Sequence, residues 1–199
     1  MKINGIQLRL EKTFITFVLL FCSCFSYGRQ LNSEEMMIAK NNPVPAQQVI
    51  IQFLKWYKTN LNKANNFPIL VKDSADNFMV NKAASTSYLN FLKSSQYISQ
   101  KYIEYWKVFF DDKASELRDH PIQSDIPEGF DMDFVLITQE PDIILNKIAN
   151  LKFKIVSMNE KVALIGVTLP SDKSVQYEFE MYKSKAGWQI GYISTPNYD

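Results

Sequence analysis

The chain has 199 residues, of which 46% are apolar and 14% aromatic, and its formal net charge is +1. This composition is typical of a globular protein and excludes an intrinsically disordered one. The length allows one domain with a full core. The near-zero charge argues against a nucleic-acid partner, which would require an excess of Lys and Arg to neutralise phosphates.

The first 28 residues have the three-part pattern of a secretory signal peptide. Basic residues occur within residues 1–12, an uncharged and mostly apolar run covers residues 13–25, and small residues precede Gly28. The apolar run is shorter than the roughly 20 residues that a membrane-spanning helix needs. We therefore expect residues 1–28 to be cleaved after Gly28, which predicts an exported protein in the periplasm or outside the cell. An uncleaved anchor helix is the alternative.

Both cysteines, Cys22 and Cys24, lie inside this leader. A chain cleaved after Gly28 would therefore have no disulfide and no thiol nucleophile. The leader also offers a second processing route, because Cys24 follows a small residue as in a bacterial lipoprotein cleavage box. Phe21 departs from that box, which prefers leucine at this position. A lipid on Cys24 would make the protein membrane-anchored.

Residues 29–44 are polar and contain prolines, so we expect a flexible tether before a single domain over residues 45–199. The first predicted helix covers residues 45–61, because apolar side chains recur there at helical spacing. Its polar face is not strongly basic, which favours a core helix over a membrane-surface helix. The apolar stripe consists of Ile50, Phe53, Leu54, Tyr57 and Leu61.

Residues 65–77 are expected to be extended and then looped. Two further helices are predicted, over residues 85–96 and residues 100–118, the second with Ser99 as its N-cap. Its apolar stripe is Ile103, Trp106, Phe110 and Leu117, with Tyr102 and Phe109 beside it.

Residues 120–133 are rich in proline, glycine and acids, which indicates a linker loop. Residues 133–138 are short and apolar, as expected of a strand. Residues 140–150 fit either a helical turn or a loop.

The last part of the chain changes to the two-residue alternation of strands. Four are predicted, over residues 151–158, 161–169, 174–182 and 187–194, joined by short turns and therefore paired antiparallel. The side chains expected on the apolar face include Phe153, Val175, Tyr177, Phe179, Trp188, Ile190 and Tyr192. The fold class is therefore α+β: a curved antiparallel sheet whose apolar face is covered by the N-terminal helices.

This order of elements resembles the nuclear transport factor 2-like, or cystatin-like, superfamily. Within it, the chain is most similar to the uncharacterised bacterial family called domain of unknown function 3828. The resemblance rests on the "FLKWY" helix at 53–57, the "YIS" helix start at 97–99, the acidic "FDMD" stretch and the closing "GWQIGYI". Gly191 and Tyr192 depart from it, because acids would be expected there. It implies a cone-shaped pocket between sheet and helices, but no activity.

No catalytic or metal-binding signature stands out. His120, the single histidine, lies in a polar loop after a helix without a partner pattern. Asp111 and Asp112 are adjacent on a helix and point apart. The acids at 125, 128, 131 and 133 do not have the spacing of a calcium loop. We therefore expect no metal, no cofactor and no enzymatic activity, although enzymes of the superfamily place Asp, His or Tyr inside the cone.

The aromatic residues are the best candidates for contact with a ligand, although each could also serve as core. The predicted ligand-binding residues are Tyr57, Tyr102, Trp106, Phe110, Tyr177 and Trp188. Three functions stay open. An exported binding module for a small apolar ligand comes first and an interaction or inhibitor (immunity-type) envelope protein second. An isomerase or hydrolase comes third, and an inward Asp within hydrogen-bond reach of an inward Tyr would favour it.

Overall fold

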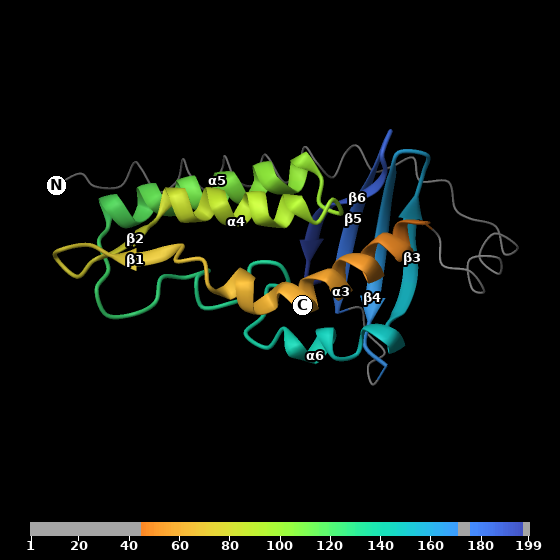
Figure 1. The fold of residues 1–199 in the computed structure, drawn as a ribbon, viewed down its shortest axis with the longest axis horizontal. Coiled ribbons are helices and arrows are strands. Elements are labelled where there is room, and N and C mark those ends of the chain that lie inside the picture. Colours follow the sequence, from red (N-terminus) through yellow and green to blue (C-terminus); the bar gives the residue numbers. More distant parts are fainter. Residues whose placement is uncertain (1–44, 171–175, 197–199) are drawn as a thin grey trace, which may run out of the picture.

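The computed structural model describes residues 45–170 and 176–196. The predicted signal peptide, the tether, Cys24 and Val175 lie outside this part of the chain. The fold is α+β, with helices first and a curved antiparallel sheet after them (Figure 1). Within the described residues, no helix combines the length and the apolar character needed to cross a membrane.

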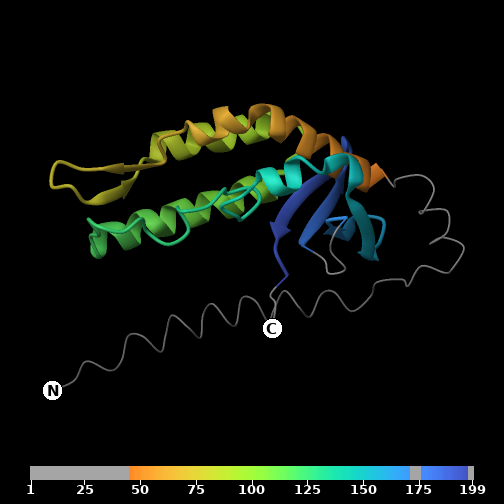
Figure 2. The same cartoon turned by 90° about the horizontal axis from the view of Figure 1, so that it is seen from below.

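Helix α3 (Pro45–Asn65) is the element that joins the sheet to the rest of the molecule. Its first half crosses one face of the sheet and its second half continues beyond the sheet (Figures 1 and 2). The predicted stripe is confirmed, since Ile50, Phe53 and Leu54 have no exposed surface. Burying each of these side chains contributes about 1.5–3 kcal/mol to folding relative to leaving it exposed.

Helices α4 (Lys82–Ser94) and α5 (Gln100–Asp119) pack against each other as a hairpin. The Ser99 hydroxyl accepts the backbone N–H of Tyr102 at 3.3 Å, which confirms the predicted cap of α5. Helix α4 begins three residues before the predicted start. The reason is Asn81, whose side chain accepts the N–H of Ala84 at 3.1 Å and caps the helix there.

Strands β3 (Lys152–Met158), β4 (Val162–Thr168), β5 (Tyr177–Ser184) and β6 (Gly187–Ser194) form one antiparallel sheet in the order β3-β4-β5-β6. This is the predicted meander. Ile165, Phe179 and Ile190 are at most 1% exposed and form the inner face with Trp188. Lys152 and Lys154 are exposed on the edge strand β3, where charged side chains discourage pairing with another chain.

The prediction that Tyr192 faces the core is wrong. A register shift occurs between Glu180 and Met181, which pair with Tyr192 and Ile190, so Gly191 is the extra residue of a β-bulge. The bulge reverses the alternation, and Ile193 is buried in place of Tyr192. Tyr192 turns to the outer face, where its ring packs edge-on against Tyr105 at a centroid distance of 4.8 Å.

The three helices do not share the sheet as a cover. Helix α3 crosses it and α5 touches β6. Just before α5, Ile98 forms an isolated bridge with Ile190 of β6. Helix α4 and most of α5 lie beside the sheet and form an arm with the second half of α3 (Figures 1 and 2). The expectation of a three-helix cover is therefore wrong. Helices α4 and α5 pack mainly against each other, and α5 also packs against β2 (Phe78–Val80) and the ring of Phe134. The Phe91 ring of α4 contacts Trp56 of α3.

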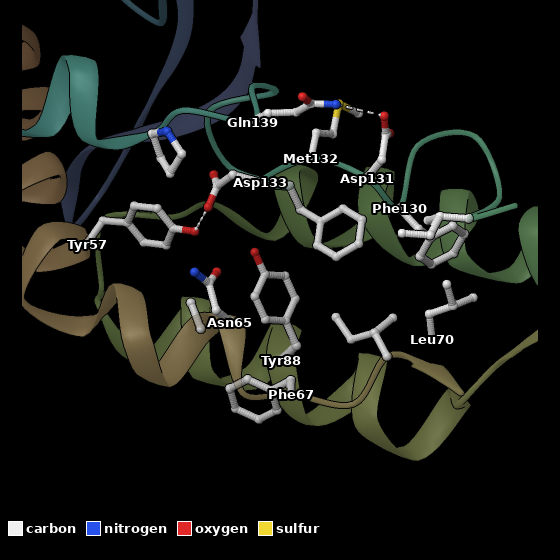
Figure 3. A pocket seen from close by; sticks show the side chains of 15 residues that line it. Tyr57, Asn65, Phe67, Leu70, Tyr88, Phe130, Asp131, Met132, Asp133 and Gln139 are labelled. Atoms are coloured by element: carbon white, nitrogen blue, oxygen red, sulfur yellow. Dashed lines mark hydrogen bonds between the residues drawn. The ribbon is translucent and has the colours of Figure 1, made fainter. Parts of the chain in front are cut away.

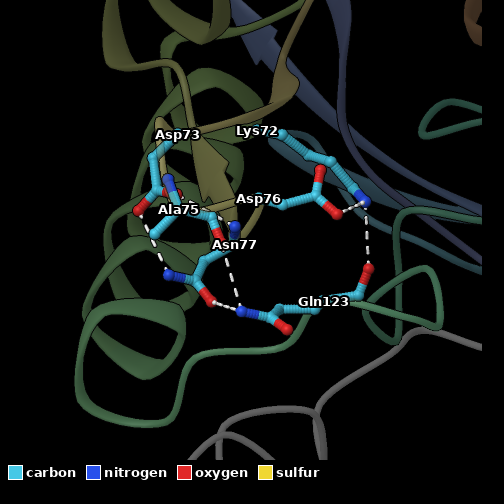
Figure 4. Close-up of polar contacts among 6 residues, drawn as sticks. All are labelled: Lys72, Asp73, Ala75, Asp76, Asn77 and Gln123. Atoms are coloured by element: carbon cyan, nitrogen blue, oxygen red, sulfur yellow. Dashed lines mark hydrogen bonds and ion pairs between the residues drawn. The ribbon is translucent and has the colours of Figure 1, made fainter.

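A small hairpin, β1 (Leu70–Lys72) and β2 (Phe78–Val80), stands at the far end of this arm. Asp73 shapes its turn, because one carboxylate oxygen accepts the N–H groups of Ala75 and Asn77 at 2.8 and 2.9 Å (Figure 4). The Lys72 amine and the Gln123 side chain then fasten the hairpin to the segment after α5. Residues 65–77 were predicted only as extended and looped.

Replacing Asp73 with alanine should lower the midpoint of thermal unfolding, since two turn N–H groups would lose their acceptor. Asp73→Asn should lower it less, because the amide oxygen can still accept both bonds. Hydrogen bonding lowers the pKa of Asp73, so its contribution is present above the unfolded pKa and is lost as pH falls through the folded one. Ser74→Ala in the same exposed loop is the control in circular dichroism melts.

The predicted strand at 133–138 is also wrong. Residues 134–137 form turns, closed by the Ile137 N–H donating to the Asp133 carbonyl at 2.8 Å. Ile137 has a φ of 50°, which breaks an extended run.

The helical alternative for residues 140–150 is correct, with helix α6 (Asp142–Leu145) and a short 3-10 turn at Ile148–Asn150.

Candidate functional site

A pocket of about 480 Å³ lies in the arm, between the second half of α3, α4, β1 and residues 126–141 (Figure 3). Most of its lining residues are apolar or aromatic, but polar and apolar atoms contribute about equally to its surface. Small-molecule sites commonly combine apolar residues with a few placed polar groups. It does not lie between the sheet and the helices, where the resemblance implied a cone. Its lining residues are Tyr57, Ala64, Asn65, Phe67, Ile69, Leu70, Tyr88, Ile126, Phe130, Asp131, Met132, Asp133, Phe134, Gln139 and Pro141.

Asp133 is the central polar residue of this pocket. Its Oδ1 accepts the backbone N–H groups of Val135 and Leu136 at 3.0 and 2.7 Å, which holds the following turn in place. Its Oδ2 accepts the hydroxyl of Tyr57 at 2.5 Å (Figure 3). A carboxylate from a loop and a phenol from α3 therefore meet at the pocket wall.

Tyr88, from α4, completes a carboxyl–tyrosine cluster with Asp133 and Tyr57. Its hydroxyl points toward the other two groups (Figure 3). Burial raises the pKa of both tyrosines far above the ordinary value, and the nearby Asp133 charge raises it further. Both hydroxyls are thus uncharged hydrogen-bond donors at neutral pH.

The pKa of Asp133 is raised above its usual value, because burial disfavours the ionised carboxylate. The hydrogen bonds from Tyr57, Leu136 and Val135 act in the opposite direction but do not outweigh burial. No Lys, Arg or His side chain is among the described residues that line the pocket. The carboxyl group is therefore stabilised by neutral donors and by no cation of the lining.

This pKa shift predicts how stability depends on pH. A group whose folded pKa is raised favours the folded state below its unfolded pKa, and loses this contribution as pH rises through the folded pKa. The wild type should therefore lose stability relative to Asp133→Asn as pH increases from about 3 to about 7. Urea unfolding of both proteins across this range measures the difference. Asp125→Asn, which removes an exposed acid of the same segment, controls for loss of one charge.

Of the predicted ligand-binding residues, the structure places Tyr57 in the pocket and the other five elsewhere. Tyr102, Trp106 and Phe110 are at most 5% exposed and pack on one another in the arm. Tyr177 and Trp188 are buried on the sheet. These five side chains serve as core, which was the alternative for each.

The hydroxyl of Tyr102 is buried close to the cluster without a well-formed hydrogen bond. Burial raises the pKa of this hydroxyl, and the nearby Trp106 indole acts in the opposite direction without outweighing burial. Burial raises the pKa of Tyr177 to about 12, with a further contribution from Asp133. The electrostatic surroundings of Asp133 thus include four tyrosines, namely Tyr57, Tyr88, Tyr102 and Tyr177.

The remaining candidates lie at the surface, as expected. His120 is exposed at the end of α5, and Asp111 pairs with Lys82 at 3.4 Å. Among the described residues no group of His, Cys, Asp or Glu has the arrangement of a metal site.

Sequence reasoning treated Asp133 as one of four loop acids. Its position directly before the apolar run 134–137 was the available signal that this carboxylate points inward.

A second pocket, of about 640 Å³, lies between the β1–β2 hairpin and the end of α5. Its polar residues are already paired with neighbours at the surface. Asp73 caps its own turn, Lys82 contacts Asp111, and Arg118 contacts Asp119 at 3.0 Å. The first pocket is the better candidate site because its buried polar groups face the cavity.

No model of a known protein family, no curated protein and no solved structure matches this chain. The case for function therefore rests on the site itself.

Proposed function

We propose that this protein is an exported, non-enzymatic binding module that holds a small, mostly apolar molecule in the pocket beside α3. The observation that carries the proposal is the carboxyl–tyrosine cluster at the wall of a cavity whose lining residues are mostly apolar or aromatic. Polar groups of this kind orient a ligand, while the apolar wall supplies the burial that holds it. No cofactor is part of the proposal.

Native mass spectrometry of the protein purified from its own cells tests this proposal. We expect a small co-purifying mass with the wild type and none with Ile126→Trp, which places a large side chain at a lining position that is 58% exposed. The matched control is Val156→Trp, at a 46% exposed position on β3 that does not line the pocket. The same small mass in all three proteins, or in none, would count against the proposal.

A proton-transfer enzyme, such as an isomerase, is the second candidate. The contact between the Tyr57 hydroxyl and Asp133 favours it, because an inward carboxyl of raised pKa is suited to act as acid or base. A co-purified molecule incubated in deuterated water would distinguish the two. Deuterium incorporated at carbon by the wild type, and not by Asp133→Asn, would indicate an enzyme.

An envelope interaction or inhibitor (immunity-type) protein is the remaining alternative. Exposed apolar side chains do occur on the described residues. Tyr105 and Val108 are neighbours on α5. The others come from separate elements: Met79, Ile126, Ile143 and Val156. A second protein in the same mass spectra, in place of a small molecule, would favour this alternative.

Membership of the nuclear transport factor 2-like superfamily and of the domain of unknown function 3828 family stays a proposal. The order of helices followed by a four-stranded meander supports it. Export is likewise proposed from the leader sequence, either with cleavage after Gly28 or with a lipid on Cys24. The mass of the mature protein from its own cells would distinguish these two routes.

A further inference from the structure

We propose that the pocket beside α3 selects an organic cation: a small amine or ammonium compound with an apolar or aromatic body. This inference rests on the proposed function, since it names the ligand class of the same site. It comes from the charge of the lining, the ring content of the wall and the hydrogen bonding of Asp133.

The charge of the lining has one sign. Asp131 and Asp133 are the charged residues among the described lining, and both are acids. Lys63 directly precedes the lining residue Ala64 in α3, but it is not itself a lining residue. Its Nζ lies 5.0 Å from the centre of the Phe91 ring. An anionic ligand would enter this pocket against two carboxylates without a compensating cation, which costs free energy.

The end of α3 adds to this field. Ala64 and Asn65, the last residues of the helix, line the pocket. The C-terminal end of a helix has a partial negative charge, which attracts cations within about one turn. The backbone and the two acids therefore favour the same sign of ligand.

Aromatic rings surround the same space. Tyr57, Phe67, Tyr88, Phe130 and Phe134 all line the pocket. The rings of Tyr88 and Phe134 are 5.8 Å apart and meet edge to face, and Phe67 meets Tyr88 in the same way at 5.7 Å. Ring faces attract ammonium groups, and recognition of quaternary or alkylated ammonium by several rings is a common use of this attraction.

Asp133 retains the capacity to accept one more hydrogen bond. An ionised carboxylate has about four acceptor positions, and the described contacts use three of them, from Val135, Leu136 and Tyr57. A bound ammonium would occupy the remaining position and supply the positive charge that the lining lacks. This contact would also favour the ionised form, which burial disfavours.

Three probes with the same phenylethyl body test the inference: 2-phenylethylammonium, 2-phenylethanol and 3-phenylpropanoate. Their binding to the purified full chain is measured by isothermal titration calorimetry at pH 7 and low salt. We expect the ammonium to bind about tenfold tighter than the alcohol, and the carboxylate to bind weakest. In Asp133→Asn the advantage of the ammonium over the alcohol should fall to about twofold.

Two further variants keep the test decisive. Asp125→Asn removes an exposed acid that does not line the pocket and should leave the preference unchanged. Asp131→Asn changes an exposed lining acid, so it tests the charge effect without disturbing the core, and it should reduce the preference for the ammonium by about threefold.

The outcomes separate this inference from the proposed function. Binding of the alcohol or the carboxylate at least as tightly as the ammonium would overturn the cation preference and leave the binding pocket in place. An ammonium preference that survives in both Asp133→Asn and Asp131→Asn would also overturn it. Binding of none of the three probes would contradict the binding pocket itself.

Discussion

Replacing Trp106 with alanine should lower the free energy of unfolding by about 3–5 kcal/mol, the usual cost of removing a large buried aromatic side chain. Trp106 is 5% exposed and its ring contacts those of Tyr102, Tyr105, Phe109, Phe110 and Phe134. Its loss would leave a cavity at the junction of α5 and the 126–141 segment. Urea unfolding followed by circular dichroism measures the change.

The matched control for Trp106→Ala is Tyr105→Ala. Tyr105 is the neighbouring residue of the same helix but is 45% exposed, so its replacement should cost about 1 kcal/mol or less. Equal effects of the two variants would show that Trp106 is not core. Trp106 is one of the predicted ligand-binding residues, and the cost expected for Trp106→Ala would support the core role that its burial indicates.

Replacing Gly191 with alanine should cost about 1–3 kcal/mol, as expected when a methyl group is forced into a packed site. A Cβ at this position would overlap the ring of Tyr182, which covers the bulge on the outer face of the sheet. Tyr182 is held there by Glu180 and by Lys101, whose amine lies 4.2 Å from the ring centre. The ring therefore has little freedom to move aside.

A double-mutant cycle with Tyr182→Ala tests this cause. If the overlap is responsible, Gly191→Ala should cost much less in the Tyr182→Ala background, with a coupling energy of about 1 kcal/mol or more. Additive effects would mean that the cost comes from the bulge backbone and not from the ring. Thermal unfolding of the four proteins supplies the cycle.

Asp133 shows why the site was the least predictable part of the molecule. Its hydrogen-bond partners are local on one side, at Val135 and Leu136, and distant on the other, at Tyr57, which is 76 residues away in the chain. The alternation of apolar residues predicts which side chains are buried. It does not predict which loop carboxylate will meet a buried hydroxyl, because that depends on how α3 and the loop pack.

The sequence by itself determined the helices, the four-stranded meander and their α+β class, because helical and strand periodicities are local properties of the chain. Ser99 as the cap of α5 was equally local. The tertiary structure alone decided the bulge at Gly191, the outward turn of Tyr192, the arm formed by α4 and α5, and the meeting of Asp133 with Tyr57 and Tyr88. Each of these depends on contacts between segments far apart in the chain, and such contacts leave no periodic trace in the order of residues.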